Sequence, residues 1–168
     1  DGGSSDSSFL ITLTGTNDTP VVTPYASRSA TEAAAPITGQ LKATDVDAAD
    51  TLTFALSGAP IAGLTLNADG SWSFDPANAA YDSLTAGQQQ TITVAYTVTD
   101  NDGGSSDSSF SINLTGTNDL PVVDAITPLS TTEGAAAITG QLTSSDPDAG
   151  ATASFSLIGN PIAGLTLN

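Results

Sequence analysis

An internal repeat constrains the fold of this chain more than any other feature of its sequence. Residues 1–18 read DGGSSDSSFLITLTGTND and residues 102–119 read DGGSSDSSFSINLTGTND, so the two copies differ only at Leu10/Ser111 and Thr12/Asn113. Residue 1 corresponds to residue 102, an offset of 101, and the segment PIAGLTLN at Pro60 recurs at Pro161 with the same offset. A period of this length predicts a tandem array of similar modules, each the size of a small domain.

The repeat divides the 168 residues into three parts. We expect residues 1–17 to be the terminal strand of a preceding repeat, and residues 18–117 to be one complete repeat. Residues 118–168 would then be the N-terminal half of the following repeat. Neither partial unit carries enough strands to close a core by itself. The partial units belong to a longer array or, alternatively, neighbouring chains complete them.

Short segments with alternating apolar residues predict β-strands throughout the chain. Residues 91–99 (TITVAYTVT) and 108–115 place apolar side chains on one face and mostly Thr or Ser on the other. Further strands are expected over residues 37–43, 51–57, 64–66 and 71–74, with a hairpin turn at 67–70. Residues 76–84 could form one short helical turn. About seven short strands per 100 residues predict an all-β fold, an immunoglobulin-like β-sandwich.

The charge of the chain is strongly one-sided, with 18 acidic residues, two basic ones and a formal net charge of −16. Nucleic acids and anionic membranes would repel such a chain, so neither is expected as a partner, whereas bound cations would relieve the self-repulsion. The sequence has no Cys and no His, which excludes disulfides, thiolate or imidazole metal sites and His-based acid–base catalysis. No apolar run reaches the roughly 20 residues of a membrane-spanning helix, so direct membrane insertion is not expected.

The acidic residues are concentrated where the predicted strands end. In a sandwich that the chain enters at one end, the loops with Asp45-Val-Asp47 and Asp100-Asn-Asp102 return to that end, near Asn17-Asp18. Glu32 and Asp82 fall at the opposite end, beside Asn118-Asp119. The following repeat would present Asp146 and Asp148 to the same linker. The expected metal ligands are therefore Asn17, Asp18, Glu32, Asp45, Asp47, Asp82, Asp100, Asp102, Asn118, Asp119, Asp146 and Asp148.

Convergent carboxylates repel one another unless a hard cation binds them. Ca²⁺ suits this arrangement, because it takes 6–8 oxygen ligands from carboxylates, Asn side chains and backbone carbonyls. Alternate residues of an Asp-x-Asp segment can reach one ion. Solvated turns rich in Asp and Gly are the alternative for any single Asp, but the assembled set predicts calcium.

Six motifs, in order, resemble a VCBS repeat, a module that recurs in giant bacterial surface and RTX-type adhesins. They are ATDVD at Ala43, LTFAL at Leu52, GSWSFDP at Gly70, YDSL at Tyr81, YTVTD at Tyr96 and GTND followed by Pro-Val at Gly116. The layout is also similar to cadherin repeats. That resemblance implies calcium between domains, with Glu32, Asp45, Asp47 and Asn118-Asp119 in the ligand positions, and with Asp146 and Asp148 in the following repeat. Where cadherins have an acidic pair before the penultimate strand, this chain has Asp82 alone.

The function expected from these features is a calcium-stabilised spacer in a large secreted adhesin of the bacterial cell surface. Its partners would be neighbouring repeats of the same chain, with self-assembly possible. A surface filament or layer subunit is one alternative. A carbohydrate-binding module is another, with Trp72, Tyr25 and Tyr81 as candidate aromatics, although the alternation of residues 71–74 places Trp72 in the core beside Phe74. We do not expect an enzyme, because the carboxylates lie in repeated turns and no nucleophile–base pair accompanies them.

Overall fold

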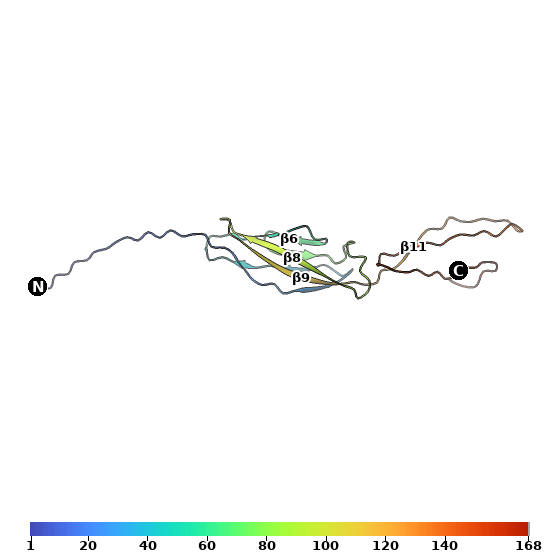
Figure 1. Ribbon diagram of the computed structural model, residues 1–168, viewed down its shortest axis with the longest axis horizontal. Coiled ribbons are helices and arrows are strands. Elements are labelled where there is room, and N and C mark those ends of the chain that lie inside the picture. Colours follow the sequence, from blue (N-terminus) through green and yellow to red (C-terminus); the bar gives the residue numbers. More distant parts are fainter. Residues whose placement is uncertain (168) are drawn as a thin grey trace.

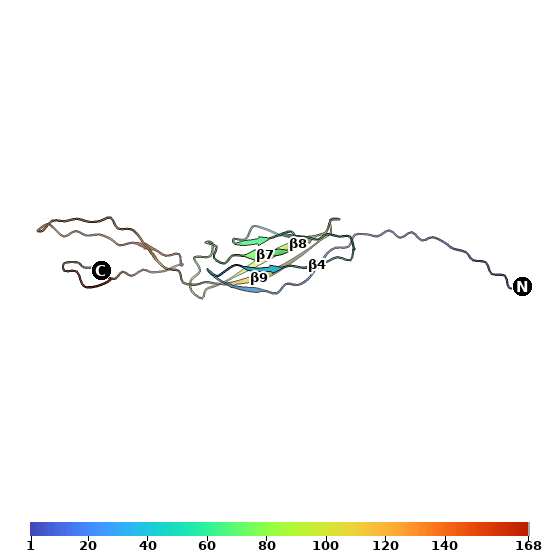
Figure 2. The ribbon, with the colours of Figure 1, turned by 180° about the vertical axis from the view of Figure 1, so that it is seen from behind.

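The computed structural model describes residues 1–167 and shows an elongated molecule with a β-sandwich in its middle (Figure 1). The N-terminal segment leaves one end of the sandwich as a single extended trace, and the C-terminal segment continues from the other end. The view from behind shows the same order along the long axis (Figure 2). The two ends of the sandwich are therefore the places where the chain enters and leaves it.

The sandwich is built from two sheets. One has four strands in the order β2-β9-β8-β5 and the other has three in the order β3-β7-β6. The bounds of the first sheet are β2 Arg28–Thr31, β5 Thr53–Leu56, β8 Gln89–Thr99 and β9 Ser105–Thr115. Those of the second are β3 Ile37–Gln40, β6 Leu64–Leu66 and β7 Ser71–Phe74. Two short pairs complete the structure, β1 (Val21–Val22) with β4 (Ala43–Thr44) and β10 (Val122–Val123) with β11 (Ser144–Ser145).

The hairpin of β8 and β9 supplies the two central strands of the four-stranded sheet. The two strands are antiparallel and paired from Gln89↔Thr115 to Thr99↔Ser105. The predicted inward residues are buried on both strands, including Tyr96 and Ile112, which are fully inaccessible. The strands start two and three residues earlier than predicted, because the polar residues Gln89 to Gln90 and Ser105 to Asp107 still pair across the hairpin.

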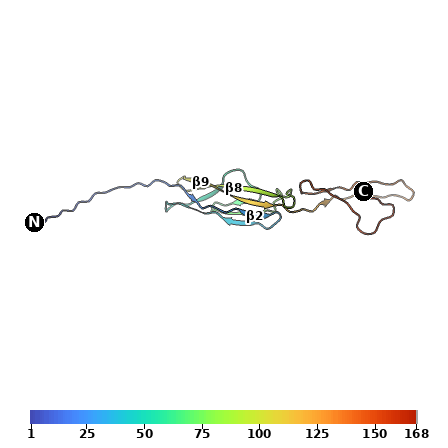
Figure 3. The ribbon, with the colours of Figure 1, turned by 60° about the horizontal axis from the view of Figure 1, so that its bottom comes forward.

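The segment 37–43, which was expected to be one strand, is divided between two pairings. Residues 37–43 form β3, which pairs with β7, and then β4, which pairs with β1. The first strand of the module is divided in the same way, since β1 is antiparallel to β4 and β2 is parallel to β9. Pro24 lies between β1 and β2, where it fixes φ and removes a backbone donor, so the ladder is interrupted at that point. Figure 3 shows β2 running beside β9 along the body.

The aromatic residues considered for carbohydrate binding pack in or against the core. Trp72 is 3% exposed and Tyr81 5% exposed. Tyr25 is half-buried and packs edge-on against Trp72 and Phe110 at centroid distances of 5.9 and 5.1 Å. The expectation that Trp72 packs on the same face as Phe74 is confirmed.

Residues 76–84 form consecutive turns and not a helix. Each turn is closed by one backbone hydrogen bond, from Asn78 to Asp75, from Tyr81 to Asn78 and from Leu84 to Tyr81. The described residues contain no helix, and therefore none that could cross a membrane. The all-β prediction is confirmed for this part of the chain.

The N-terminal copy of the repeated segment is not part of a sheet. Phe9, Ile11 and Leu13 are 86%, 75% and 92% exposed. Their counterparts in β9, which are Phe110, Ile112 and Leu114, are 4% exposed or less. Nearly the same sequence therefore takes two structures, which differ in whether a partner strand lies on either side.

Candidate metal centre

Acidic side chains gather at both ends of the sandwich. We call the group where the chain enters the entry cluster, which contains Asn17, Asp18, Asp45, Asp47, Asp50, Asp100 and Asp102. We call the group where the chain leaves the exit cluster, which contains Glu32, Asp82, Asn118, Asp119, Asp146 and Asp148. The loop that follows β4 and the β8–β9 turn build the first group. The turn after β2, residues 76–84 and the loop after β11 surround the linker in the second.

The centre of the entry cluster is a triad of carboxylates. Asp45, Asp50 and Asp100 each offer an oxygen, and these oxygens lie within 4.8 Å of one another. Two oxygens bound to one Ca²⁺ at 2.3–2.6 Å can be at most about 5 Å apart. The triad therefore has the spacing of a set of ligands that share one ion.

Hydrogen bonds hold the triad in place without using all of its oxygens. The Asp100 Oδ1 accepts bonds from the amides of Asp102 (2.9 Å) and Gly104 (2.8 Å). The Asp45 Oδ1 accepts one from the Asp47 amide at 3.0 Å. The second oxygens of Asp45 and Asp50 are buried and accept no hydrogen bond from the described residues. Each therefore retains lone pairs that face a crowded, negatively charged site.

The linker Asn17-Asp18 is attached to this site by two contacts. The Asn17 Nδ2 donates to the Asp100 Oδ2 at 3.2 Å, and the Asp18 amide donates to the Asp47 Oδ2 at 2.9 Å. Both bonds place linker atoms against carboxylates of the sandwich. A hollow of about 430 Å³, bordered by Asn17, Asp47, Asp50 and Asp102, opens the cluster to solvent.

The pKa values of two entry carboxylates move in opposite directions. Desolvation raises the pKa of Asp50, and the charges of Asp102, Asp100, Asp45 and Asp47 raise it further. Desolvation also acts to raise the pKa of Asp100, but the hydrogen bonds from the Asn17 side chain and from nearby amides outweigh it and leave that pKa lowered. The surroundings therefore stabilise the charge of Asp100 and destabilise that of Asp50.

The exit cluster repeats the linker contact of the entry cluster. The Asp119 amide donates to the Asp148 Oδ2 at 2.9 Å, and the Asp148 amide donates to the Asp146 Oδ1 at 3.0 Å. On the other side of the linker, the Thr117 amide donates to the Glu32 Oε2 at 2.7 Å. The linker is thus held by one carboxylate from the sandwich and one from the following segment.

Two carboxylates of the exit cluster are buried, compared with one, Asp100, in the entry cluster. Glu32 is 4% exposed and Asp148 8% exposed. The Glu32 Oε1, the Asp148 Oδ1 and the Asp119 Oδ2 are buried and accept no hydrogen bond from the described residues. Desolvation raises the pKa of Asp119, and the charges of Asp148, Asp82 and Asp146 add to this effect. A buried anionic oxygen without a partner is costly, so this arrangement calls for a cation.

The residues predicted to be metal ligands do not all have the same place in the two clusters. Asn118 is exposed, and its Nδ2 donates to the carbonyl of the adjacent Asp119, unlike Asn17. Asp102 and Asp82 contribute their charges at the edges of their clusters, beside Asp50 and Asp119 respectively. Sequence reasoning missed Asp50, although it lies three residues after Asp47. Its amide donates to the Asp47 carbonyl at 3.1 Å, and this turn folds the Asp50 side chain back toward Asp45.

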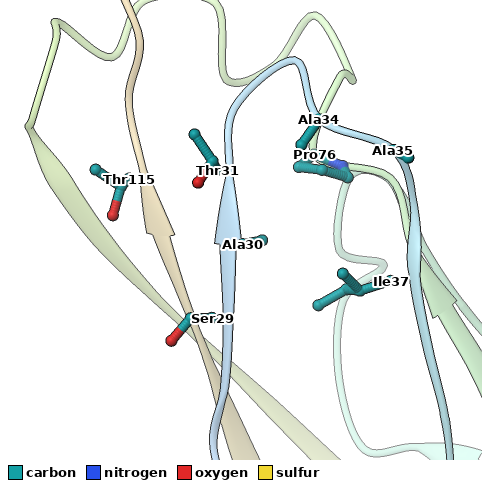
Figure 4. A pocket seen from close by; sticks show the side chains of 8 residues that line it. All are labelled: Ser29, Ala30, Thr31, Ala34, Ala35, Ile37, Pro76 and Thr115. Atoms are coloured by element: carbon teal, nitrogen blue, oxygen red, sulfur yellow. The ribbon is translucent and has the colours of Figure 1, made fainter.

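A second hollow, of about 320 Å³, lies at the open edge of the sandwich near the exit (Figure 4). It lies between β2 and the segment that leads into β3. Its lining is small and uncharged: Ser29, Ala30, Thr31, Ala34, Ala35, Ile37, Pro76 and Thr115. The lining contains no carboxylate, so the two acidic clusters remain the candidate cation sites.

The sequence profile of the family described as "Bacterial cadherin-like domain" matches residues 17–116. The chain belongs to this family. The match covers the sandwich together with its entry linker, so the expectation of a cadherin-like β-sandwich is confirmed. Cadherin-like domains are typically non-catalytic and are associated with extracellular adhesion.

Two solved structures to which the chain shows similarity come from cadherins. One is the extracellular domain of protocadherin GammaB4, with a TM-score of 0.43 and 16% identity, over 79% of this chain and 24% of that one. The other is human CDH23 EC21-23, with a TM-score of 0.42 and 18% identity, over 79% of this chain and 47% of that one. This cadherin-like chain thus spans less than half the length of either structure. No curated protein matches it.

Proposed function

We propose that this cadherin-like chain is a calcium-stiffened spacer from a tandem array, in which ions bound at the linkers hold successive modules in line. The observation that carries the proposal is the group of unpartnered buried oxygens around the exit linker. They come from Glu32 in the sandwich, Asp119 in the linker and Asp148 in the following segment. A cation bound there would join all three parts of the chain.

Calcium fits these residues better than other common ions. The donors are carboxylates, with amide and backbone carbonyl oxygens nearby, and the chain has neither Cys nor His. Hard oxygen ligands in a crowded, irregular arrangement suit Ca²⁺, whereas Mg²⁺ requires near-ideal octahedral geometry and sheds its water reluctantly. The expected magnesium effect is therefore small.

Stiffness would follow from the electrostatics of the linker. Without an ion, the exit carboxylates repel one another across a connection that is held by a few hydrogen bonds. With an ion, the same charges become shared ligands, and bending the linker would break ion–oxygen contacts. Because β8 alone has 11 residues, one module adds about 36 Å of length. An array of such modules would project a distal domain far from its anchor.

The setting we propose is a secreted adhesin of the bacterial cell surface. The support comes from the VCBS-like motifs, from the bacterial cadherin-like family and from an excess of acidic residues, which would be compensated by external calcium. A sugar-binding role has less support, because Trp72 and Tyr81 are buried in the core. Filament or layer assembly would require lateral contacts in addition to the linkers.

The first test is thermal unfolding of the 168-residue chain in millimolar calcium and in chelator. We expect calcium to raise the Tm by more than about 10 °C, which corresponds to roughly 2 kcal/mol for a domain of this size. The physical reason is that ligands assembled only in the folded state make ion binding contribute to stability. Magnesium at the same concentration should raise the Tm by much less.

Small-angle X-ray scattering on the same samples tests the stiffness. Calcium should narrow the distribution of maximum dimensions and lengthen its mean, because the segment after Asp119 becomes fixed to the sandwich. An unchanged Tm together with an unchanged scattering profile would contradict the proposed function.

A further inference from the structure

Gly104 lies at the point where the incoming linker meets the entry cluster. It directly precedes the first residue of β9, and two hydrogen bonds join it to Asp100. The Gly104 amide donates to the Asp100 Oδ1 at 2.8 Å, and the Asp100 amide donates to the Gly104 carbonyl at 3.0 Å. Gly104 is half-buried, although it belongs to a turn at the end of the sandwich.

A side chain at this position would collide with the linker and with a ligand. A Cβ built on Gly104 would lie 2.8 Å from the Asn17 Nδ2 and 3.1 Å from the Asp18 carbonyl oxygen, and it would be closer still to the Asp100 Oδ2. Contacts under 3.0 Å are essentially never made by real Cβ atoms, so neighbouring atoms would have to move. The Asp18 oxygen belongs to the backbone, and it could move only with the linker itself.

The Asp100 carboxylate could move only at the expense of the cluster. Its two oxygens accept hydrogen bonds from the amides of Asp102 and Gly104 and from the side chain of Asn17. Rotation away from a new methyl group would break these bonds. It would also take the Asp100 oxygen out of the triad with Asp45 and Asp50. Either response separates the linker from the ligands of the sandwich.

The requirement for glycine at residue 104 is steric and not conformational. The neighbouring Gly103 has φ of +95°, a left-handed backbone that favours glycine, but a Cβ there would meet nothing within 4 Å. Gly104 shows the reverse, because its backbone is outside the left-handed region and the space around it is filled. Alanine at 104 can therefore keep the turn that joins β8 to β9, and only the linker side is obstructed.

We infer that Gly104 is a positioning residue of the entry cluster, whose missing side chain admits the preceding linker to the cation site. The inference rests on the proposed function, since it assigns to Gly104 a part in calcium binding. Gly104 contacts no ion itself. It controls whether Asn17 and Asp18 can lie against Asp100 and Asp47 while the ion is bound.

The test is a calcium titration of the full 168-residue chain with the variant Gly104→Ala, followed by two-dimensional amide NMR. The amide of Asp18 reports on the entry cluster, and the amide of Asp119 reports on the exit cluster. We expect the apparent calcium affinity at Asp18 to fall at least tenfold and the affinity at Asp119 to change less than twofold. In calcium-free buffer, the amide signals of β8 and β9 should stay at their wild-type positions.

Gly3→Ala is the matched control, because it makes the same change in the same sequence, Asp-Gly-Gly-Ser-Ser, at a place where a Cβ meets nothing within 4 Å. It should leave both affinities unchanged. An unchanged affinity at Asp18 in Gly104→Ala would overturn the inference. So would the loss of the β8 and β9 signals without calcium, because glycine would then serve the fold. Failure of the wild-type chain to bind calcium would instead refute the proposed function.

Discussion

Residues 1–18 and 102–119 are nearly identical in sequence, yet they agree in structure only at their last residues. Residues 105–115 form β9 between β2 and β8, whereas the corresponding residues 4–14 have no strand partner and are exposed. In both copies, however, the amide of the final Asp donates to an Asp-x-Asp carboxylate at 2.9 Å. The strand depends on its neighbours in the sandwich, and the linker depends on the loop that follows it.

The largest effect should come from a substitution in the core of β9, the copy of the repeated segment that forms a strand. We expect Phe110→Ala to lower the free energy of unfolding by about 3–5 kcal/mol, because it removes a buried ring and leaves a cavity. Phe110 is 4% exposed and packs against Tyr25, Trp72 and Tyr96. Urea unfolding at saturating calcium measures the loss.

Phe9→Ala is the control for this prediction, since Phe9 has the same sequence neighbours on its N-terminal side and is 86% exposed. Its effect should be within about 0.5 kcal/mol of zero. Comparable losses for the two variants would mean that residues 1–15 have a packed partner in solution.

The second prediction tests whether the calcium sites at the two linkers are independent. Asp47→Asn and Asp148→Asn each keep an oxygen that can accept the linker amide but remove one negative charge. We expect each to weaken calcium at its own cluster about tenfold or more, equivalent to at least about 1.4 kcal/mol, because one charged ligand is lost. The amides of Asp18 and Asp119 report on the two sites in NMR titrations. If either variant weakened both sites equally, the clusters would be one coupled site.

The sequence predicted the clusters from strand ends alone. The alternation of residues 91–99 and 108–115 predicted the last two strands, and an up-and-down order of the strands placed Asp100 at the entry and Asn118-Asp119 at the exit. The division of β1 from β2 and of β3 from β4 could not be predicted, because an apolar alternation does not say which of two sheets a short strand joins. Asp50 and Gly104 were missed for a related reason. Their roles depend on turn geometry and on close approach of the linker, and these appear only in three dimensions.

The third prediction exchanges a triad member between the two clusters. Of the two triad members whose counterparts lie in this chain, Asp45 is repeated as Asp146 and Asp50 is not repeated. Asp50 corresponds to Ala151 in the following segment, at the offset of 101 residues. Asp50→Ala should weaken calcium at the entry cluster by about three- to tenfold, or roughly 0.6–1.4 kcal/mol. Ala151→Asp should strengthen calcium at the exit cluster by a similar factor. Isothermal titration of both variants measures the changes, and equal affinities in all three proteins would remove Asp50 from the ligand set.

The smallest effect concerns pH in the absence of calcium. The pKa values of Asp50 and Asp119 are raised above the ordinary 3.8 in the folded chain, mainly by desolvation and then by neighbouring carboxylates. Between 3.8 and each raised pKa, the folded state binds more protons than the unfolded state, so stability from these groups falls as the pH rises through that window. Asp100 has a lowered pKa, and its contribution is lost only below 3.8, outside the window.

Calcium-free chain should therefore gain stability from Asp50 and Asp119 when it is acidified from about pH 7 to about pH 4.5. Acidification also reduces the repulsion within a chain whose formal net charge is −16. The double variant Asp50→Asn/Asp119→Asn keeps almost all of that charge, so the difference between variant and wild type isolates the gain from these two carboxylates. Urea unfolding at several pH values should show that the free energy of unfolding rises less on acidification in the variant than in the wild type. With calcium present the wild type should show the opposite trend, because protons compete with the ion for the same oxygens. Parallel pH profiles for wild type and variant without calcium would show that these two carboxylates are as well solvated in the folded chain as in the unfolded one.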